Sequence, residues 1–343
     1  MRAPDFWNNV RGGEPPDSRA TLLPRLLMPL AALYTLGGRV RRNLTRPRSI
    51  SRPVLCVGNL TAGGTGKTPV ALTLAKRLAD YTPHFLTRGY GGTTAGPTRV
   101  DPDRHGWRDV GDEALLLARA APCWVARDRF SGAQMADREG AGLIIMDDGH
   151  QNPGLKKTLS LIVIDGPQGF GNGHVIPAGP LREPVAVGLR RADAVVIIGE
   201  SAPGLDKQIA DNLPPGRPVF RATARPEITA QAIDGKRLVA FAGIGRPEKF
   251  FTTLRDLGGN IVFEKPFPDH HPFTRQELDN LADAAETMQA TLVTTAKDAV
   301  RLPPAVRGKT IIVDIAIEFE DEKLIDQWLA PLRVTPLQST RVS

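Results

Sequence analysis

The feature that most constrains the fold is a series of short apolar runs that alternate with helix-like segments. The six runs lie at residues 53–59, 84–89, 123–128, 142–148, 159–166 and 193–200. Several are almost unbroken stretches of Val, Ile and Leu, which is typical of strands buried on both faces of a sheet. Helix-like segments, such as 68–81 and 112–121, lie between them. This order predicts a doubly wound, mostly parallel α/β sheet.

A second, smaller α/β pattern follows a turn-rich stretch at residues 213–227. With 41% hydrophobic and 24% charged residues, the composition is that of a globular protein, and 343 residues suffice for two domains. We place the boundary near residue 222. The expected parts are an N-terminal amphipathic helix and basic segment (1–50), a core (51–222), a smaller C-terminal α/β domain that closes over the site of the core (223–330) and a tail (331–343).

Cysteine content and net charge limit the classes of partner. Cys56 and Cys123 are the only cysteines and have no metal-type spacing, so we interpret them as small buried hydrophobes in a reducing cytosol. The net charge of +7 favours an anionic partner. Nucleic acid, acidic lipid and a phosphorylated small molecule all satisfy that condition.

The N-terminal segment carries a leucine-rich face followed by arginines. The apolar residues at helical spacing are Leu22, Leu23, Leu26, Leu27, Leu30, Leu33 and Tyr34. The longest uncharged run, Leu26 to Gly38, is shorter than the roughly 20 residues that span a bilayer, and "RVRR" after it does not fit a secretory signal. Two interpretations remain: an interfacial helix with cationic flanks, or a helix packed on the protein's own core.

The stretch "VGNLTAGGTGKTP" (57–69) follows the first apolar run and resembles a phosphate-binding loop. The pattern requires glycine where Thr61 stands, so the fit is incomplete. The loop residues Gly63, Gly64, Thr65 and Gly66 are expected to surround a nucleotide phosphate with backbone N–H groups. Lys67 is expected to reach the terminal phosphates, and Thr68 to bind Mg²⁺.

Two carboxylates follow a later apolar run, in "GLIIMDDGHQ". Asp147 and Asp148 are therefore expected at a strand end beside the phosphate loop, where a carboxylate organises the metal. Because adjacent residues on a strand point to opposite faces, only one of the two is expected to bind the metal directly.

Further polar clusters leave alternatives open when read alone. Arg88 and Arg182 lie beside glycine or proline turns and fit either substrate phosphate or a surface ion pair. Asp112 fits the cap of the helix that follows it. The cluster Asp269, His270 and His271 fits metal binding or proton transfer.

Taken in order, seven motifs resemble the tetraacyldisaccharide 4′-kinase family, from about residue 20 to about residue 330. They are "VGNLTAGGTGKTP", "TRGYGG", "GDEA", "DDGHQ", "IPAGPLREP", "DHHPF" and "TTAKDAVR". The resemblance implies ATP- and Mg²⁺-dependent phosphorylation of the 4′-hydroxyl of an acylated glucosamine disaccharide 1-phosphate, which gives the 1,4′-bisphosphorylated lipid A precursor. Loops of this family commonly lack the first glycine, so Thr61 is no objection.

The resemblance also implies roles for individual residues. Lys67 and Thr68 would hold phosphates and metal, with Asp147 and Asp148 organising the metal. Asp112 matches the proposed base, and His270 matches the histidine that works with it. The substrate-lining positions are matched by Arg88, Tyr90, Gln151 and Arg182. In "DDGHQ", His150 stands where the family commonly has an aromatic residue, which leaves the packing there open.

Family members are bound to the cytoplasmic face of the inner membrane of Gram-negative bacteria, which favours the interfacial interpretation of the N-terminal helix. We expect a monomer that does not bind nucleic acid. A GTPase switch or metallochaperone would need an N-K-x-D motif, which "TAKD" (295–298) does not provide. A nucleic-acid-binding ATPase would need exposed aromatic residues, and aromatics make up only 6% of the chain.

Overall fold

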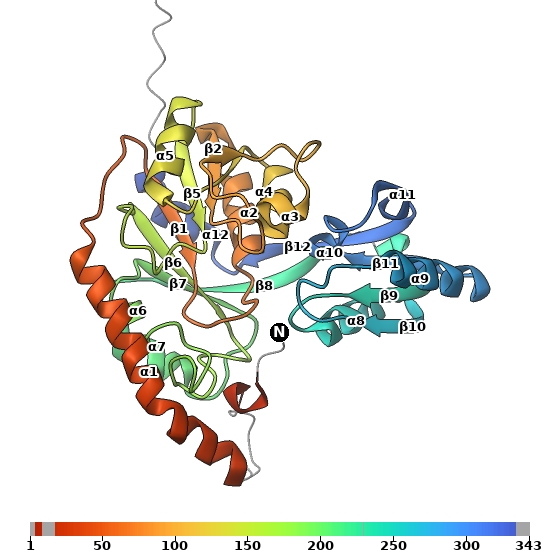
Figure 1. The fold of residues 1–343 in the computed structure, drawn as a ribbon, viewed down its shortest axis with the longest axis horizontal. Coiled ribbons are helices and arrows are strands. Elements are labelled where there is room, and N and C mark those ends of the chain that lie inside the picture. Colours follow the sequence, from red (N-terminus) through yellow and green to blue (C-terminus); the bar gives the residue numbers. More distant parts are fainter. Residues whose placement is uncertain (1–3, 9–17, 229, 334–343) are drawn as a thin grey trace, which may run out of the picture.

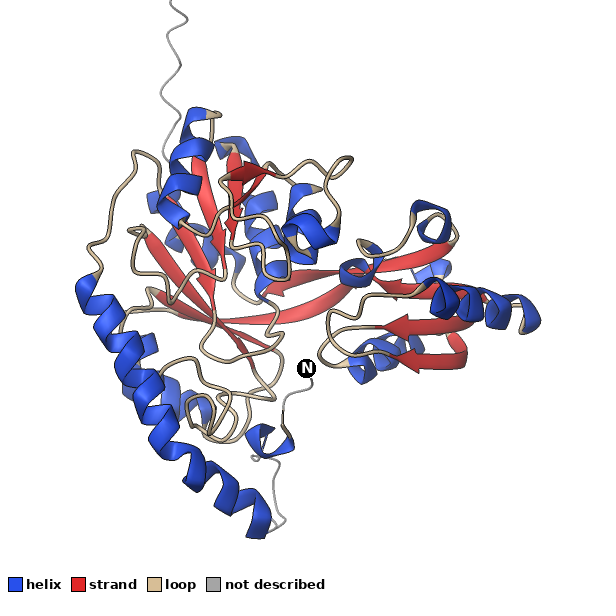
Figure 2. Cartoon of the chain, in the orientation of Figure 1, coloured by secondary structure: helices blue, strands red, loops and turns tan. Residues whose placement is uncertain are grey.

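A computed structural model describes residues 4–8, 18–228 and 230–333, and its strands form a single twelve-stranded sheet (Figures 1 and 2). The strand order is β10-β9-β11-β12-β8-β7-β6-β1-β5-β2-β4-β3. Neighbouring strands are parallel except in the β3–β4 and β8–β12 pairs. The prediction of a mostly parallel α/β sheet is confirmed.

The large lobe contains the strands that the six apolar runs predict. Its strands are β1 (Val54–Gly58), β2 (Pro83–Thr87), β3 (Thr98–Arg99), β4 (Cys123–Val125), β5 (Leu143–Asp147), β6 (Leu159–Asp165) and β7 (Ala194–Ile198). Only the short β3 lies outside the runs. Every residue of β1, β2 and β4 to β7 is buried, which explains why their sequences lack polar alternation.

Helices cover both faces of this part of the sheet. They are α2 (Lys67–Arg77), α3 (Trp107–Val110), α4 (Asp112–Ala118), α5 (Arg129–Arg138), α6 (Val185–Leu189), α7 (Leu205–Asn212) and α12 (Glu322–Trp328), with short 3-10 turns η1 (Asp5–Asn8), η2 (Ala79–Tyr81) and η4 (Ala330–Leu332). Leu55 and Val57 pack in the layer with α2, whereas Val54 and Cys56 pack with α5. Cys56 and Cys123 are buried, unpaired thiols, as predicted.

The small lobe repeats the same construction on a smaller scale. It contains β9 (Arg237–Ala242), β10 (Asn260–Pro266), β11 (Thr291–Thr295), α8 (Pro247–Asp256), α9 (Arg275–Thr287), α10 (Ala296–Ala299), α11 (Pro304–Arg307) and η3 (Ala230–Ala232). Phe251 of α8 packs on one face of these strands and Leu281 of α9 on the other.

Two long strands join the lobes: β8 (Val219–Glu227) and β12 (Thr310–Phe319). The interpretation of 213–227 as turn-rich is therefore wrong for its second half. Pro226 is tolerated because the parallel ladder with β7 ends at Ala222, so β8 has a partner on one side only from there on. The expected boundary near residue 222 falls inside β8, and the division into domains stays a prediction.

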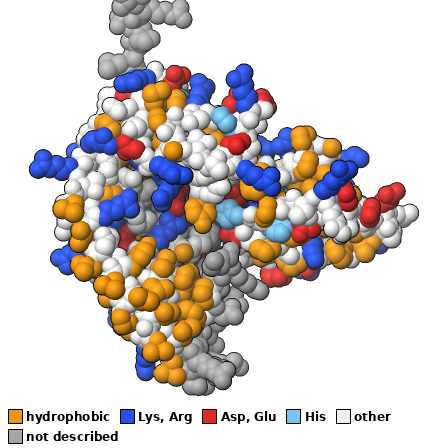
Figure 3. All heavy atoms as spheres, in the orientation of Figure 1, with side chains coloured by type: hydrophobic (Ala, Val, Ile, Leu, Met, Phe, Trp, Pro, Cys, Tyr) orange, Lys and Arg blue, Asp and Glu red, His pale blue; other side chains and the backbone are white. Residues whose placement is uncertain are grey.

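Helix α1 (Ser18–Leu44) runs along the outside of the large lobe (Figure 1). Ala31 is buried against the large lobe, and Leu27 is partly buried there. Leu26, Leu33 and Leu36 are 74%, 65% and 56% exposed, so most of the leucine face does not pack on the protein's own core. In Figure 3 hydrophobic side chains gather at the lower left, along the course of α1. Residues 1–3, 9–17 and 334–343 of the expected terminal parts lie outside the described residues.

Candidate active site

The loop between β1 and α2 has the backbone of an anion-binding loop. β1 ends at Gly58 and α2 begins at Lys67, so the loop opens onto the N-terminal end of a helix. Gly63 and Gly66 adopt φ values of 108° and 87°, which favour glycine. A Cβ on Gly66 would lie 2.7 Å from Ile198 Cδ1, so β7 leaves no room for a side chain there.

Asn59 holds this loop closed and was not identified from the sequence. Its side chain is fully buried, and Nδ2 donates to Thr61 O at 2.7 Å and to Thr65 Oγ1 at 3.1 Å. Thr61, at the position where the pattern requires glycine, is itself buried and forms a β-bridge to Leu181. The one available signal was a polar amide directly after a buried strand.

Asp147 at the end of β5 faces the first turn of α2. Thr68 Oγ1 donates to Asp147 Oδ2 at 3.0 Å, whereas Asp147 Oδ1 is buried and has no hydrogen-bond partner among the described residues. Burial, followed by the charge of Glu113, raises the pKa of Asp147 to about 7. A buried, unpartnered carboxylate oxygen beside a threonine hydroxyl is a donor set that a hard cation would satisfy.

Asp148 follows the last residue of β5 and contacts basic side chains that Asp147 does not contact. Its φ of 55° turns the chain out of β5. Arg182 Nη1 donates to Asp148 Oδ1 at 2.7 Å, and Lys67 Nζ lies 3.9 Å from the same oxygen. Burial opposes ionisation, but Lys67 and Arg182 outweigh it and hold the pKa of Asp148 below its ordinary value.

Asp112 and His270 meet across the two lobes. Asp112 is the first residue of α4, and Gly111 takes the capping position. His270 Nδ1 lies 2.8 Å from Asp112 Oδ2, and Asp112 Oδ1 accepts the Glu113 amide at 3.0 Å. Burial alone would raise the pKa of Asp112, but His270 and Lys297 lower it on balance. The hydrogen bond that His270 donates to Asp112 raises the pKa of His270.

The histidines of the Asp269–His271 cluster diverge. His271 Nε2 contacts Glu277 at 3.0 Å, whereas Asp269 accepts from Lys297 at 3.3 Å. The cluster therefore does not present three ligands to one ion, and only His270 faces Asp112.

Lys297 is a further site residue to which sequence analysis gave no role. Its Nζ lies 3.1 Å from His270 Nε2 and 3.7 Å from Glu113 Oε1, so it contacts both lobes. Burial opposes its charge, but Glu113 and Asp269 prevail and raise the pKa of Lys297. It lies in the motif "TTAKDAVR", which was the available signal.

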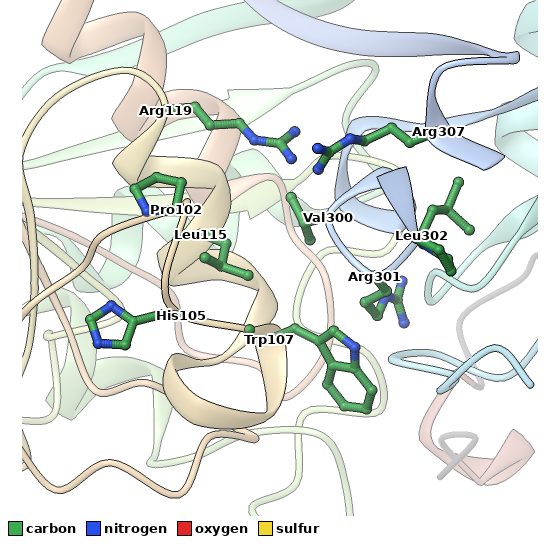
Figure 4. Close-up of a pocket in the computed structure, with 11 residues that line it drawn as sticks. Pro102, His105, Trp107, Leu115, Arg119, Val300, Arg301, Leu302 and Arg307 are labelled. Carbon is green, nitrogen blue, oxygen red and sulfur yellow. The ribbon is translucent and has the colours of Figure 1, made fainter. Parts of the chain in front are cut away.

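A cavity of about 290 Å³ lies between the lobes (Figure 4), lined by residues between 102 and 119 of the large lobe and between 300 and 307 of the small lobe. Trp107 and Leu115 line one wall, and Arg301 lies opposite, with its Nε 3.9 Å from Asp112 Oδ2. At the other end, Arg119 and Arg307 point toward one another. None of the phosphate-loop residues lines this cavity.

Gln151 connects the phosphate loop to the buried carboxylate of Glu183. Gln151 Nε2 donates to Asn59 O at 2.9 Å and to Glu183 Oε1 at 3.0 Å. Glu183 is 2% exposed and was not identified from the sequence, although it follows Arg182 in a quoted motif. His150 fills the site of the expected aromatic residue: its ring is buried and contacts Ser160 Oγ at 2.9 Å and Gly188 O at 3.0 Å.

The remaining expected substrate-binding residues are on the surface. Tyr90 is 69% exposed, and its ring lies edge-on to His270 with 5.9 Å between centroids. Arg88 is exposed, and its side chain forms no hydrogen bond or ion pair within the described part of the chain. The structure thus joins Gln151 and Arg182 to the phosphate-loop network and leaves Arg88 and Tyr90 available to a ligand.

Comparison with known proteins gives a consistent result. A family model described as tetraacyldisaccharide-1-P 4′-kinase matches residues 23–333. The chain is 52% identical to the tetraacyldisaccharide 4′-kinase of Rhodospirillum centenum, covering 97% of each chain, and 49% identical to that of Paramagnetospirillum magneticum, covering 98% of each. It is also similar to the crystal structure of LpxK from Aquifex aeolicus in complex with ATP. That match has a TM-score of 0.73 and 25% identity, and covers 90% of this chain and 99% of the other.

Proposed function

This chain belongs to the tetraacyldisaccharide 4′-kinase family, and we propose that it transfers the γ-phosphate of ATP to the 4′-hydroxyl of tetraacyldisaccharide 1-phosphate. The product is the 1,4′-bisphosphorylated lipid A precursor. One observation carries the assignment of the site: the phosphate loop, Asp147 and Asp112 lie on one lobe, and His270 of the other lobe is hydrogen-bonded to Asp112. A P-loop GTPase remains the alternative that the assay below would detect.

Asp112 is the proposed acceptor of the 4′-hydroxyl proton. Lys297 is an ammonium and donates to His270 Nε2, so His270 is neutral and carries its proton on Nδ1, from which it donates to Asp112. This tautomer follows from the hydrogen-bond network. The arrangement keeps Asp112 ionised and oriented until a hydroxyl group approaches. Lys67 balances charge on the transferring phosphoryl group.

Mg²⁺ fits the residues at the end of β5. Thr68 and Asp147 would hold the ion directly, supported by the unpartnered Oδ1 of Asp147, and Asp148 would orient its waters. No three His, Cys, Asp or Glu side chains converge as a metal cluster in the described ranges. The other ligands of the ion would be water and phosphate oxygens. When bound, the ion neutralises phosphate charge.

The leucine face of α1 is the proposed membrane contact. No helix in the described part of the chain is long and apolar enough to cross a bilayer. The exposed leucines and the arginines that follow them fit the headgroup boundary of the cytoplasmic face of the inner membrane. There the enzyme, proposed to act as a monomer, would meet an acceptor whose acyl chains stay in the bilayer. Arg88, Tyr90, Gln151 and Arg182 would contact that acceptor.

The test is an assay with purified protein and tetraacyldisaccharide 1-phosphate in detergent, supplied with ATP-Mg²⁺ or, in a parallel reaction, with GTP-Mg²⁺. We expect a product with one added phosphate on the 4′-oxygen, identified by mass spectrometry and phosphorus NMR. Hydrolysis of GTP without a phosphorylated lipid would instead favour the GTPase.

Two variants test the site assignments in that assay. Asp112→Asn should lower kcat by about 10²- to 10⁴-fold with little change in ATP affinity, because only proton transfer is lost. Lys67→Ala should lower both kcat and the affinity for ATP. Asp103→Asn is the matched control, since Asp103 is an exposed carboxylate in the same lobe. Near-normal turnover of Asp112→Asn would reject Asp112 as the base.

A further inference from the structure

The last turn of α1 contains two adjacent arginines with different surroundings, Arg41 and Arg42. Arg42 Nη1 donates to Glu183 Oε2 at 3.3 Å, and its side chain is only 21% exposed. Arg41 is exposed, and its side chain forms no hydrogen bond or ion pair with another described residue. Both residues carry one positive charge in the same helical turn, but only Arg42 is connected to the large lobe.

Glu183 gives this contact a route to the phosphate loop. It is a buried carboxylate that accepts two hydrogen bonds from Arg191 Nη2, at 2.7 and 2.9 Å, and one from Gln151 Nε2 at 3.0 Å. Gln151 in turn donates to the backbone oxygen of Asn59, the residue that holds the loop closed. Arg42 is thus separated from the phosphate loop by two side chains.

A second connection to the phosphate loop starts at Arg182. Arg182, the residue before Glu183, is paired with Asp148, and Asp148 lies 3.9 Å from Lys67. The backbone at Arg182 is also tied to the segment that leads into the phosphate loop, since the Arg182 amide donates to Leu60 O at 2.7 Å. A displacement of Glu183 would therefore move a segment that is hydrogen-bonded to Leu60 and, through Asp148, linked to Lys67.

We propose that Arg42 is a positioning residue that, through Glu183, fixes the orientation of the membrane-contacting helix relative to the phosphate loop. The inference rests on the proposed function, because it assumes an acceptor held in a bilayer. The sugar headgroup of such a lipid lies at a fixed distance from the hydrocarbon core of the membrane. The angle between α1 and the large lobe then sets the distance between the acceptor hydroxyl and the loop.

The experiment compares Arg42→Gln with its matched control Arg41→Gln. Arg41→Gln should weaken partitioning onto anionic vesicles about fivefold, and Arg42→Gln by less, because the charge of Arg42 is paired with Glu183. Arg191 still pairs with Glu183 in Arg42→Gln, so the variant is expected to fold, which the thermal midpoint checks. With enzyme fully bound to vesicles that contain the acceptor, kcat of Arg42→Gln should be about tenfold below that of Arg41→Gln.

A water-soluble, short-chain disaccharide acceptor provides the discriminating readout. Such an acceptor is not held in the membrane, so its hydroxyl can reach the loop whatever the angle of α1. The kcat values of the two variants should then agree within about twofold, with equal KM for ATP. Arg42→Lys should recover part of the loss on vesicles, because an ammonium keeps the charge but not the planar fork. Equal kcat values on vesicles, or an equal loss with the soluble acceptor, would overturn the proposal.

A readout without substrate separates this proposal from the proposed function. Binding of the wild-type chain and Arg41→Gln to vesicles should slow amide hydrogen exchange at residues 59–66 and 151, whereas in Arg42→Gln it should not. If the wild-type chain phosphorylates no lipid but this difference persists, the proposed function fails and the connection stands. If vesicles alter exchange equally in all three chains, the connection is refuted.

Discussion

The buried His150, three residues after the end of β5, should make folding stability fall steeply in mild acid. His150 is 2% exposed, and Gly188 O accepts from its Nε2, so Ser160 donates to its Nδ1 and the neutral ring is fully satisfied. A proton on Nδ1 would make the Ser160 hydroxyl the acceptor of this hydrogen bond and would place a charge in the core. Burial, followed by the charge of Arg191, lowers the pKa of His150 from 6.5 to about 3.

The magnitude follows from the two pKa values of His150. As the pH falls below 6.5, the unfolded chain binds a proton at this residue and the folded chain does not, so the free energy of unfolding decreases. The decrease continues until the pH reaches the folded pKa of about 3. Between pH 8 and pH 5 it amounts to about 2 kcal/mol from this side chain alone.

The assay is urea unfolding followed by tryptophan fluorescence at pH 8, 7, 6 and 5. His150→Gln keeps a polar side chain but cannot titrate, so its free energy of unfolding should lose about 2 kcal/mol less than that of the wild type between pH 8 and pH 5. Ser160→Ala is the control, because it removes the hydrogen-bond partner and leaves the histidine. It should cost about 1 kcal/mol at every pH and keep the wild-type slope. A His150→Gln slope equal to that of the wild type would refute the reasoning.

Two further predictions concern the site and the helix. Lys297→Gln removes a cation that lowers the pKa of both His270 and Asp112. The acid limb of the pH–rate profile should therefore move to higher pH. An unchanged profile would show that Lys297 does not influence the proton transfer. Replacing the exposed Leu26 and Leu33 together by Gln should weaken vesicle partitioning by about 2 kcal/mol per leucine, measured by co-sedimentation, and leave the urea midpoint unchanged. A shifted midpoint with normal partitioning would mean that the leucines support the fold.

The sheet was predictable because its strands are buried on both faces, and such strands leave unbroken apolar runs such as Leu143–Asp147. β8 was missed because Pro226 and the glycine and prolines before it are typical of turns, and only the one-sided pairing of its second half makes the proline acceptable. Periodicity could not decide the environment of α1, since a core helix and an interfacial helix share one pattern. That question needed the exposed fractions of its leucines.

The candidate site was predictable only where its residues form local motifs. The phosphate loop and Asp147 belong to short patterns whose chemistry is known from their spacing. Asp112 and His270 are 158 residues apart, so no local signal pairs them, and the family resemblance was needed. Asn59 and Glu183 are single polar residues whose importance depends on burial and on partners distant in the sequence.

The two lobes are joined by β8 and β12, which belong to one continuous hydrogen-bonded sheet, rather than by a flexible linker. To separate Asp112 from His270, the chain must bend or twist this two-stranded ladder. Its backbone hydrogen bonds oppose such a deformation. Such a connection permits small, reversible excursions and restores the original alignment afterwards. Each catalytic cycle would therefore begin from nearly the same relative orientation of acid–base pair and nucleotide, without a search over many arrangements.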